Sequence, residues 1–197
     1  WIEGWLKKNG IDYSLNDNTQ MPPDFYLDPD NKTEGLMEIK AFNYKGSPGF
    51  DIADFRMYER EIAQKPWMLN VTYLVFGYDM AEDGTVTIKK VWQKKVWEMS
   101  RPMKSGKSKT IWPINLQIKQ GTVHKMRPAK WYGKQTAFSI YDCLEDFLSA
   151  MEETMYKNKD TRDDAPDWLQ KVLDNYEKHY GVRLQIPRWN DIASKYV

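Results

Sequence analysis

Short apolar segments of strand length alternate along this chain with longer segments of helical periodicity, and this order restricts the folds it can adopt. The predicted elements of the first half are strands over Phe25–Leu27 and Leu36–Phe42, a helix over Ile52–Gln64, and strands over Asn70–Asp79 and Thr85–Trp92. Turn residues at Asp28–Asn31 indicate that the first two strands form a hairpin. Such a mixture predicts an α+β fold, with a central mixed sheet flanked by helices.

The second half of the chain continues this mixed pattern. Clean alternation over Pro113–Lys119 and a tight turn at Gln120–Gly121 predict a second, basic hairpin with Thr122–Arg127. Ser139 is a favourable helix N-cap, and Asp142 follows three residues later. The expected helix has an apolar stripe of Ile140, Leu144, Phe147, Leu148, Met151 and Met155.

Glycine and proline mark the limits of further segments. Trp1–Asn9 has the pattern of the last turns of a helix, which Gly10 ends. Pro166 begins another predicted helix, and Gly181 ends it. Met103–Lys109 is rich in lysine and is expected to be a flexible connector.

Length and composition fit a folded domain with a substantial hydrophobic core. The 197 residues are 41% hydrophobic and include nine Trp, twelve Tyr and seven Phe, too many large apolar groups for a chain that stays unfolded. We expect a single domain over residues 1–197, with a catalytic core at about 10–98, a basic segment at about 99–135 and C-terminal helices at about 136–197. Residues 186–197 match no pattern.

Several classes of protein are excluded. No apolar run approaches the roughly 20 residues that a membrane helix needs, so no membrane partner is expected. The single cysteine, Cys143, excludes an internal disulfide and a cysteine-rich zinc site, and it suits a reducing cytosol. No signal peptide is visible and the chain starts at Trp1, so we expect a cytoplasmic protein that lacks some N-terminal residues here.

Basic residues are concentrated in one part of the chain. The net charge is only +1, yet residues 99–141 contain no Asp or Glu. The basic residues of this stretch are Arg101, Lys104, Lys107, Lys109, Lys119, Lys125, Arg127, Lys130 and Lys134. A basic segment on an otherwise acidic chain favours a polyanion binder, although a solvated lysine-rich loop would have the same composition.

A group of charged residues lies on the first predicted hairpin. Pro23-Asp24 precedes its first strand, and Glu38-Ile39-Lys40 follows after thirteen residues within its second strand. Because strand side chains alternate, Glu38 and Lys40 project from one face while Ile39 points into the core. The hairpin places Asp24 on the neighbouring strand or at its mouth, so two carboxylates and one ammonium converge.

This combination suits a hard divalent cation. Mg²⁺ takes oxygen ligands and needs only one or two protein carboxylates, here Asp24 and Glu38, and the backbone carbonyl of Ile39 could add another oxygen. The metal would polarise a phosphoryl oxygen and lower the pKa of a bound water. Lys40 would orient that water or stabilise charge on the phosphate. The cluster lacks His and Cys, which argues against zinc. The alternative is a surface hairpin with solvated charges.

The segment Met21–Asp79, with its Pro-Asp, its Glu-Ile-Lys and its order of hairpin, helix and strand, resembles the PD-(D/E)xK nucleases, the superfamily of most type II restriction endonucleases. Ser47–Phe55, Tyr73–Tyr78 and Asn115–Gly121, the last leading to Arg127-Pro128, resemble certain small restriction enzymes.

The resemblance implies a chemistry and a set of roles. The activity is Mg²⁺-dependent hydrolysis of DNA phosphodiesters that leaves 5′-phosphates. Asp24 and Glu38 are then metal ligands, and Lys40 is the catalytic lysine. For a type II restriction endonuclease we further expect sequence-specific cleavage of double-stranded DNA by a homodimer, because palindromic sites match two-fold symmetric proteins. A companion DNA methyltransferase is also implied.

Further acidic residues are candidates for accessory roles. Many members of the superfamily use a carboxylate from a helix before or after the hairpin, and Glu3 and Glu59 are the candidates here, although a solvated helix position is the simpler interpretation of each. Asp28 and Asp30 are expected to form the turn, but either could replace Asp24 if the hairpin register differed.

The basic segment would have to grip phosphates and read base edges. A two-stranded ribbon fits the major groove, and Asn, Gln and Lys are residue types that bond base edges. The candidates are Lys104, Lys107 and Lys109 for phosphates, Asn115, Gln117 and Lys119 for bases, and Lys125, Arg127 and Lys130 along an adjoining positive strip. The alternative for this hairpin is an ordinary edge hairpin whose polar face is solvated. The alternative for Trp131, which lies beside the basic strip, is that it packs under the following helix.

Two other functions fit the same residues. The first is a nuclease of the same superfamily that acts on DNA structure in repair or recombination. The second is a nucleic-acid-binding module without catalysis, in which the acidic cluster has no role.

Overall fold

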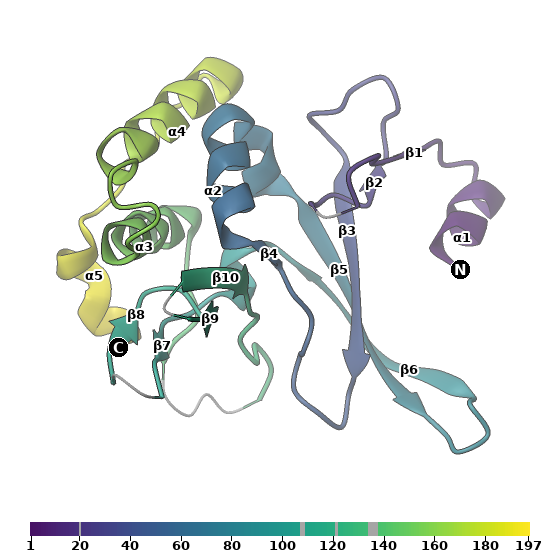
Figure 1. Ribbon diagram of the computed structural model, residues 1–197. Helices are drawn as coiled ribbons and strands as arrows, with labels where there is room; N and C mark the ends of the chain where they lie inside the picture. The colour runs from purple at the N-terminus through teal and green to yellow at the C-terminus, as the bar shows by residue number, and fades with distance from the viewer. Residues whose placement is uncertain (20, 107–108, 121, 134–137) are drawn as a thin grey trace.

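The computed structural model describes residues 1–19, 21–106, 109–120, 122–133 and 138–197. Its centre is a five-stranded mixed sheet that carries helices on both faces (Figure 1). A smaller, three-stranded sheet lies beside helix α2. The predicted mixed sheet flanked by helices is therefore confirmed.

The main sheet has the strand order β1-β2-β3-β5-β6. Its strands are β1 (Ser14–Leu15), β2 (Phe25–Tyr26), β3 (Leu36–Asn43), β5 (Thr72–Met80) and β6 (Val86–Lys94). Strands β3 and β5 are parallel, and every other neighbouring pair is antiparallel. The pairing of β2 with β3 confirms the first predicted hairpin.

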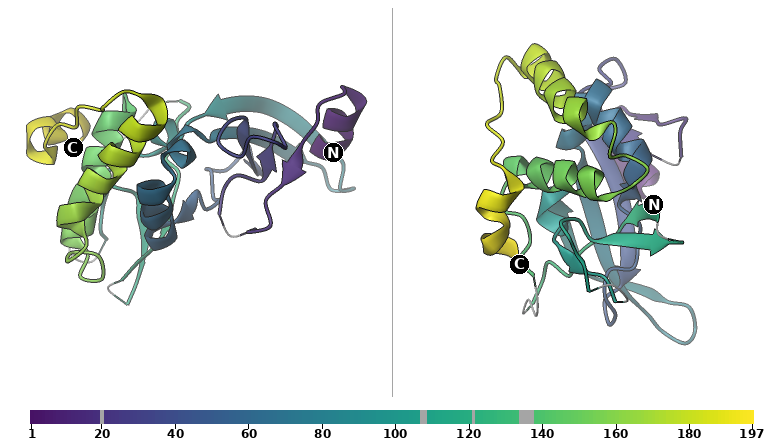
Figure 2. Two further views of the ribbon diagram at one scale, coloured as in Figure 1. Left: turned by 90° about the horizontal axis from the view of Figure 1, so that it is seen from above. Right: turned by 60° about the vertical axis from the view of Figure 1, so that its left-hand side comes forward.

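One face of the main sheet packs against the larger core. Its helices are α2 (Phe55–Gln64), α3 (Leu144–Lys157), α4 (Ala165–Tyr180) and α5 (Trp189–Tyr196), with short 3-10 turns at η1 (Pro66–Asn70) and η2 (Trp97–Met99). Tyr58 and Ile62 of α2 are fully buried together with Val75 of β5 and Leu148 of α3. Figure 2 shows α3 and α4 stacked outside α2, away from the sheet.

The short helix α1 (Ile2–Lys8) lies on the other face of the sheet. Leu6 of α1 is buried against Phe25 and Met37, and Ile39 packs at the edge of this smaller cluster. Gly10 follows the helix with φ of 65°, a left-handed conformation that suits glycine. The N-terminus thus lies at the opposite end of the molecule from the C-terminus (Figure 2).

The second sheet joins the basic hairpin to helix α2. It consists of β4 (Ala53–Asp54), β9 (Leu116–Lys119) and β10 (Thr122–Met126), with β10 in the middle. The predicted hairpin is confirmed, but the helix expected over Ile52–Gln64 begins only at Phe55. The reason is that Ile52 donates its backbone N–H to Met126 and the next two residues pair with β10.

Two further expectations about local structure are wrong. Met103–Lys109 is not simply a connector, because Met103–Lys104 (β7) pairs with Ile111–Trp112 (β8); Lys107 and Ser108 lie outside the described residues. Ser139 does not cap α3, which begins at Leu144. The backbone N–H of Ser139 is bonded instead to the carbonyl of Tyr196, so a tertiary contact holds this segment out of the helix.

The C-terminal elements agree better with the sequence. Helix α4 carries Pro166 in its first turn and ends at Gly181, whose φ of 70° is the predicted left-handed stop. The unassigned residues 186–197 contain helix α5, which buries Trp189, Ile192 and Tyr196. Within the described ranges, no helix is both long enough and apolar enough to cross a membrane.

Candidate active site

Strand β3 carries Glu38 and Lys40, the two charged residues that the sequence predicts on one face of a strand. Alternation along the strand turns Leu36 and Phe42 into the larger core, and Glu38 and Lys40 lie on that same face. The ammonium of Lys40 is 2.6 Å from Oε1 of Glu38. The two side chains therefore form a close ion pair that is almost buried on the carboxylate side and partly exposed on the amine side.

Asp24 reaches the same strand from the mouth of the hairpin. It directly precedes β2, and its Oδ2 accepts a hydrogen bond of 2.8 Å from the backbone N–H of Ile39. This amide lies between Glu38 and Lys40 in the chain. The carboxyl of Asp24 is thus held at the backbone between the two paired residues, close enough for its negative charge to act on Glu38.

Glu38 is the most perturbed carboxyl of this group. The residue is only 4% exposed. Burial raises the pKa of its carboxyl to about 7, and the negative charge of Asp24 adds to this, while Lys40 and the backbone N–H of Asp24 oppose it. Its second oxygen, Oε2, is buried and has no hydrogen-bond partner among the described residues. A buried carboxylate oxygen in this state is ready to accept a proton or to bind a cation.

A cavity of about 150 Å³ opens beside the ion pair. Its lining consists of Thr19, Met21, Pro22, Glu38, Lys40, Asp51, Ile52, Ala53, Asp54 and Lys125. Asp24 is not part of this lining, whereas Asp51, Asp54 and Lys125 are. The cavity therefore brings together strand β3, the residues before helix α2, and strand β10 of the basic hairpin.

The comparisons with known proteins decide the family. The model of the NgoBV restriction endonuclease family matches residues 1–196. The chain belongs to this family.

Two curated relatives are type II restriction enzymes from Neisseria. NlaIV of Neisseria lactamica is 51% identical over 197 residues, which make up 100% of this chain and 79% of that enzyme. NgoBV of Neisseria gonorrhoeae is 44% identical over 120 residues, 61% of this chain and 65% of that enzyme. The solved structure of the NlaIV restriction endonuclease matches with a TM-score of 0.94 at 51% identity, covering 100% of this chain and 78% of that one.

These matches confirm that the chain is a type II restriction endonuclease with a restriction-endonuclease fold. Enzymes of this type act on DNA and are metal-dependent as a class. The residues present fit a hard cation, because Glu38 offers a buried oxygen that has no hydrogen-bond partner in the described part of the chain, and the carboxyl of Asp24 is held at the adjacent Ile39 amide. Among the described residues, no group of three or more His, Cys, Asp or Glu could hold a metal, so protein carboxylates would have to be supplemented by other oxygens.

Asp51 and Asp54 are not among the candidate site residues that the sequence indicates, although both line the cavity beside Glu38. Both lie in the stretch that resembles small restriction enzymes, but no strand or helix pattern brings them next to Glu38. Arg127 is 2.6 Å from Oδ1 of Asp51, and Lys125 is 3.7 Å from Oδ2 of Asp54. The sequence places Asp54 inside the helix expected over Ile52–Gln64, and only the structure shows it as the N-cap of α2.

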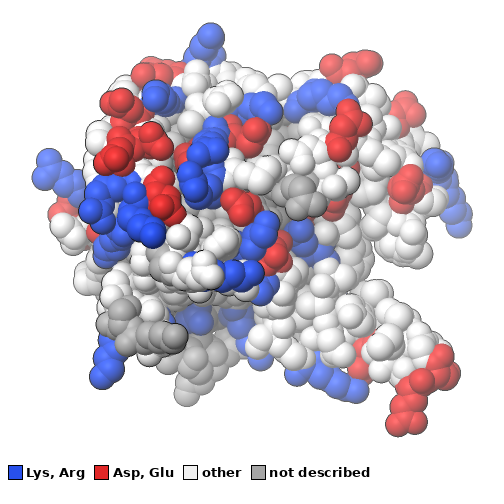
Figure 3. All heavy atoms as spheres, in the orientation of Figure 1, with Lys and Arg blue, Asp and Glu red and all other residues white. Residues whose placement is uncertain are grey.

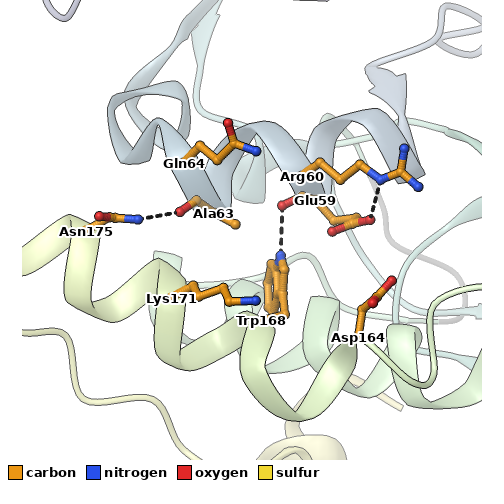
Figure 4. Close-up of a pocket in the computed structure, with 8 residues that line it drawn as sticks. All are labelled: Glu59, Arg60, Ala63, Gln64, Asp164, Trp168, Lys171 and Asn175. Atoms are coloured by element: carbon orange, nitrogen blue, oxygen red, sulfur yellow. Dashed lines mark hydrogen bonds and ion pairs between the residues drawn. The ribbon is translucent and has the colours of Figure 1, made fainter.

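The two candidate accessory carboxylates lie away from this cavity. Glu3 accepts a hydrogen bond of 2.8 Å from the Tyr13 hydroxyl, at a separate hollow next to β1. Glu59 lines a pocket of about 320 Å³ between α2 and α4, where its carboxylate lies 3.6 Å from Nε of Arg60 (Figure 4). In the same pocket the indole of Trp168 donates to the carbonyl of Glu59. Neither carboxylate is positioned to join Glu38.

Asp28 and Asp30 belong to the turn, as expected. Oδ1 of Asp28 accepts hydrogen bonds from the backbone N–H groups of Asp30 and Asn31, at 3.0 and 3.2 Å. Both aspartates are exposed. The register Phe25↔Met37 leaves Asp24 as the carboxylate that reaches β3.

The candidate DNA contacts have unequal surroundings. Asn115 donates its side-chain amide to the carbonyls of Arg127 and Pro128, so this amide stabilises the hairpin itself. Gln117 is half-buried, whereas Lys119 is exposed at the end of β9. The exposed lysines of the segment before it are Lys104 and Lys109, while Lys107 and Lys134 lie outside the described residues. In Figure 3, acidic side chains lie at the tip of the β5–β6 hairpin at the lower right with basic ones beside them, and both signs of charge are mixed over the rest of the visible face.

Two aromatic residues of the basic segment pack on the main sheet. Trp131 meets Phe42 of β3 at a centroid distance of 5.9 Å and Trp92 of β6 at 5.4 Å, so these two ring contacts are made with the main sheet. Tyr132 stacks on Trp92 at 5.0 Å, and the ammonium of Lys130 lies 5.1 Å from the centre of the Tyr132 ring. The basic segment is therefore anchored to the sheet that carries Glu38.

Proposed function

We propose that this endonuclease hydrolyses both strands of DNA at a specific short sequence, with Mg²⁺ as cofactor, and leaves 5′-phosphates. The observation that carries the proposal is the buried carboxylate of Glu38, paired with Lys40 and adjoined by Asp24 at the edge of an open cavity. Glu38 and Lys40 at the cavity, with Asp24 held at the neighbouring Ile39 amide, supply the two acidic groups and the amine that metal-assisted phosphodiester hydrolysis uses.

Asp24, Glu38 and the backbone carbonyl of Ile39 would hold the cation. When bound, Mg²⁺ supplies positive charge to the phosphate and lowers the pKa of a bound water. The side chain of Glu38 is fixed by burial and by its contact with Lys40, so little reorganisation is needed at this ligand. Lys40 keeps an ammonium at the cavity, where it can donate a hydrogen bond to the attacking water or to a phosphate oxygen.

The β9–β10 hairpin would read the DNA sequence in the major groove. Gln117 and Lys119 are the base-reading candidates we favour, because the amide of Asn115 is already bonded within the hairpin. Lys104, Lys109 and Lys130 would contact phosphates from exposed positions. We also infer a cytoplasmic homodimer that cuts a two-fold symmetric site, and a companion methyltransferase that protects the host DNA.

Cleavage by a Lys40→Ala variant tests the proposal. With plasmid DNA and Mg²⁺, the parent chain should give a reproducible set of fragments, and sequencing their ends should reveal one short site with 5′-phosphates. Lys40→Ala should lose cleavage by at least about 100-fold and retain DNA binding, because the amine acts only on the reacting groups. Chelation of the metal should have the same effect.

Lys157→Gln provides the control for this experiment. Lys157 is a surface residue of α3 that pairs with Glu153 at 3.3 Å, and its removal should leave cleavage unchanged. Parental cleavage by Lys40→Ala would refute the site assignment. Fragments that depend on nicks or branches rather than on a fixed sequence would instead indicate a structure-specific nuclease.

A further inference from the structure

Strand β10 connects the basic hairpin directly to the cleavage cavity. Lys125 pairs in register with Asp54 of β4, and its side chain lines the same cavity as Glu38 and Lys40. The opposite end of β10 forms the hairpin turn with β9, whose last residue is Lys119. A single short strand therefore runs from the proposed base-reading surface to the proposed catalytic cavity.

The two ammonium groups of the cavity differ in how firmly they are held. Lys40 lies 2.6 Å from Glu38, within hydrogen-bond distance. Lys125 lies 3.7 Å from Asp54, beyond the usual length of a charge-assisted hydrogen bond, and its side chain is 32% exposed. Lys125 is thus the cation that can turn towards an incoming anion at little cost.

An incoming phosphate would meet several negative charges in this cavity. Glu38, Asp51 and Asp54 all line it, and two phosphate oxygens share another negative charge. Lys40 is already paired with Glu38, so a further cation, besides the metal that the site would hold, would help to balance the anion that enters. Lys125 is the second lysine in this lining.

We propose that Lys125 contacts a non-bridging oxygen of the scissile phosphate and that Asp54 is the residue that positions it. This inference rests on the proposed function and assigns Lys125 to the cleavage step rather than to general DNA affinity. Because Lys125 belongs to the reading hairpin, correct docking of that hairpin on its bases brings the cation to the phosphate that is cut.

Asp54 is suited to this positioning role by its two separate contacts. Its Oδ1 accepts a hydrogen bond of 3.1 Å from the backbone N–H of Met57, which caps helix α2, while its Oδ2 faces Lys125. The cap fixes the carboxylate, and the carboxylate attracts the ammonium of Lys125 to this side of the cavity without a hydrogen bond that would lock it. Asn would keep the cap and remove the charge that faces Lys125.

Single-turnover cleavage and DNA affinity, measured separately on the full chain, test the role of Lys125. The substrate is an oligonucleotide duplex that contains the site mapped from plasmid digestion. Lys125→Gln should lower the single-turnover rate with Mg²⁺ by about 100-fold, while affinity for the duplex without metal changes by less than about threefold. Lys157→Gln is the matched control and should change neither quantity.

Asp54→Asn tests the positioning role through coupling. Alone, it should slow cleavage by about tenfold, and in the Lys125→Gln background it should have no further effect, since the cation it directs is gone. If Asp54 had a purely structural role, Asp54→Asn would slow cleavage by the same factor in the parent and in the Lys125→Gln variant. That result would overturn the positioning assignment.

Two outcomes separate this inference from the proposed function. If Lys40→Ala abolishes cleavage but Lys125→Gln cleaves at the parental single-turnover rate, the role of Lys125 is wrong and the nuclease site stands. If Lys125→Gln lowers affinity and rate by the same factor, Lys125 is an ordinary phosphate contact and the inference also fails. If Lys40→Ala keeps its activity, the proposed site itself is wrong.

Discussion

Two buried glutamates show how surroundings decide the use of a side chain. Burial raises the pKa of both Glu38 and Glu59 to about 7. Glu38 is paired with Lys40 beside an open cavity, and its other oxygen has no partner among the described residues. Glu59 faces Arg60 across 3.6 Å at the contact between α2 and α4. We therefore assign Glu38 to chemistry and expect Glu59 to act on stability alone.

Glu59→Gln should stabilise the protein at neutral pH. The pKa of Glu59 is about 7 in the folded state, whereas the ordinary value of 4.5 applies to the unfolded state. Between these two pH values the folded state therefore binds more protons than the unfolded state. The free energy of unfolding of the parent then falls as the pH rises from 4.5 to 7. Gln avoids this loss, and its advantage at pH 8 should be on the order of 2 kcal/mol.

Denaturant unfolding at several pH values measures this difference. Glu61→Gln, on the same helix, is the control, because Glu61 is more exposed and pairs with Lys65 at 2.7 Å. Its effect at each pH gives the baseline for removing one negative charge from this helix. An advantage of Glu59→Gln that is equal at low and high pH would contradict the assignment of the raised pKa to burial.

At the scale of elements, β4 and the cap of α2 form the joint between the two sheets. Ala53 and Asp54 pair with β10, and the side chain of Asp54 then begins the helix. The same short segment of chain thus sets the position of the basic hairpin and the entrance of the cavity. A change at this joint is expected to affect both folding and cleavage.

Asp54→Ala should destabilise the protein by about 1 kcal/mol, because the N-cap hydrogen bond to Met57 is lost. Asp54→Asn should stay within about 0.5 kcal/mol of the parent, since Asn accepts the same bond. Thermal or denaturant unfolding of the two variants provides the measurement. Equal losses for Ala and Asn would mean that the contact with Lys125, and not the cap, is what stabilises this joint.

At the scale of the whole molecule, charge is divided unevenly along the chain. Residues 99–141 carry nine basic residues and no acidic one, although the net charge of the protein is only +1. The structure holds part of this segment against the acidic side chains of the cavity, through the contacts of Lys125 and Arg127. DNA must therefore compete with Asp51 and Asp54 for some of the basic groups.

DNA affinity should depend strongly on salt. Between about 50 mM and about 200 mM monovalent salt, we expect a loss of roughly 100-fold or more, because bound counterions are released from the phosphates. Lys104→Gln should reduce the slope of log affinity against log salt by about 1, for all DNA sequences alike. Lys157→Gln should leave the slope unchanged. Binding that hardly varies with salt would exclude the basic segment as the phosphate contact.

Several local features of this endonuclease follow from its sequence alone. Alternation along Leu36–Phe42 decides which side chains share a face, and it therefore pairs Glu38 with Lys40. The turn before this strand brings Asp24 into reach, and Gly181 ends a helix where its missing Cβ allows a left-handed backbone. These outcomes depend on neighbours in the chain, and local sequence encodes such neighbours.

Which distant segments share the cavity depends instead on the tertiary fold. Asp51, Asp54 and Lys125 meet Glu38 because β10 pairs with β4, and no periodicity within one segment encodes a pairing between residues so far apart in the chain. The same reason explains the helix expected from Ser139, where a backbone bond to Tyr196 competes successfully with a good N-cap. Long-range backbone pairing overrides local preference, because it satisfies the same hydrogen-bonding groups while burying more apolar surface.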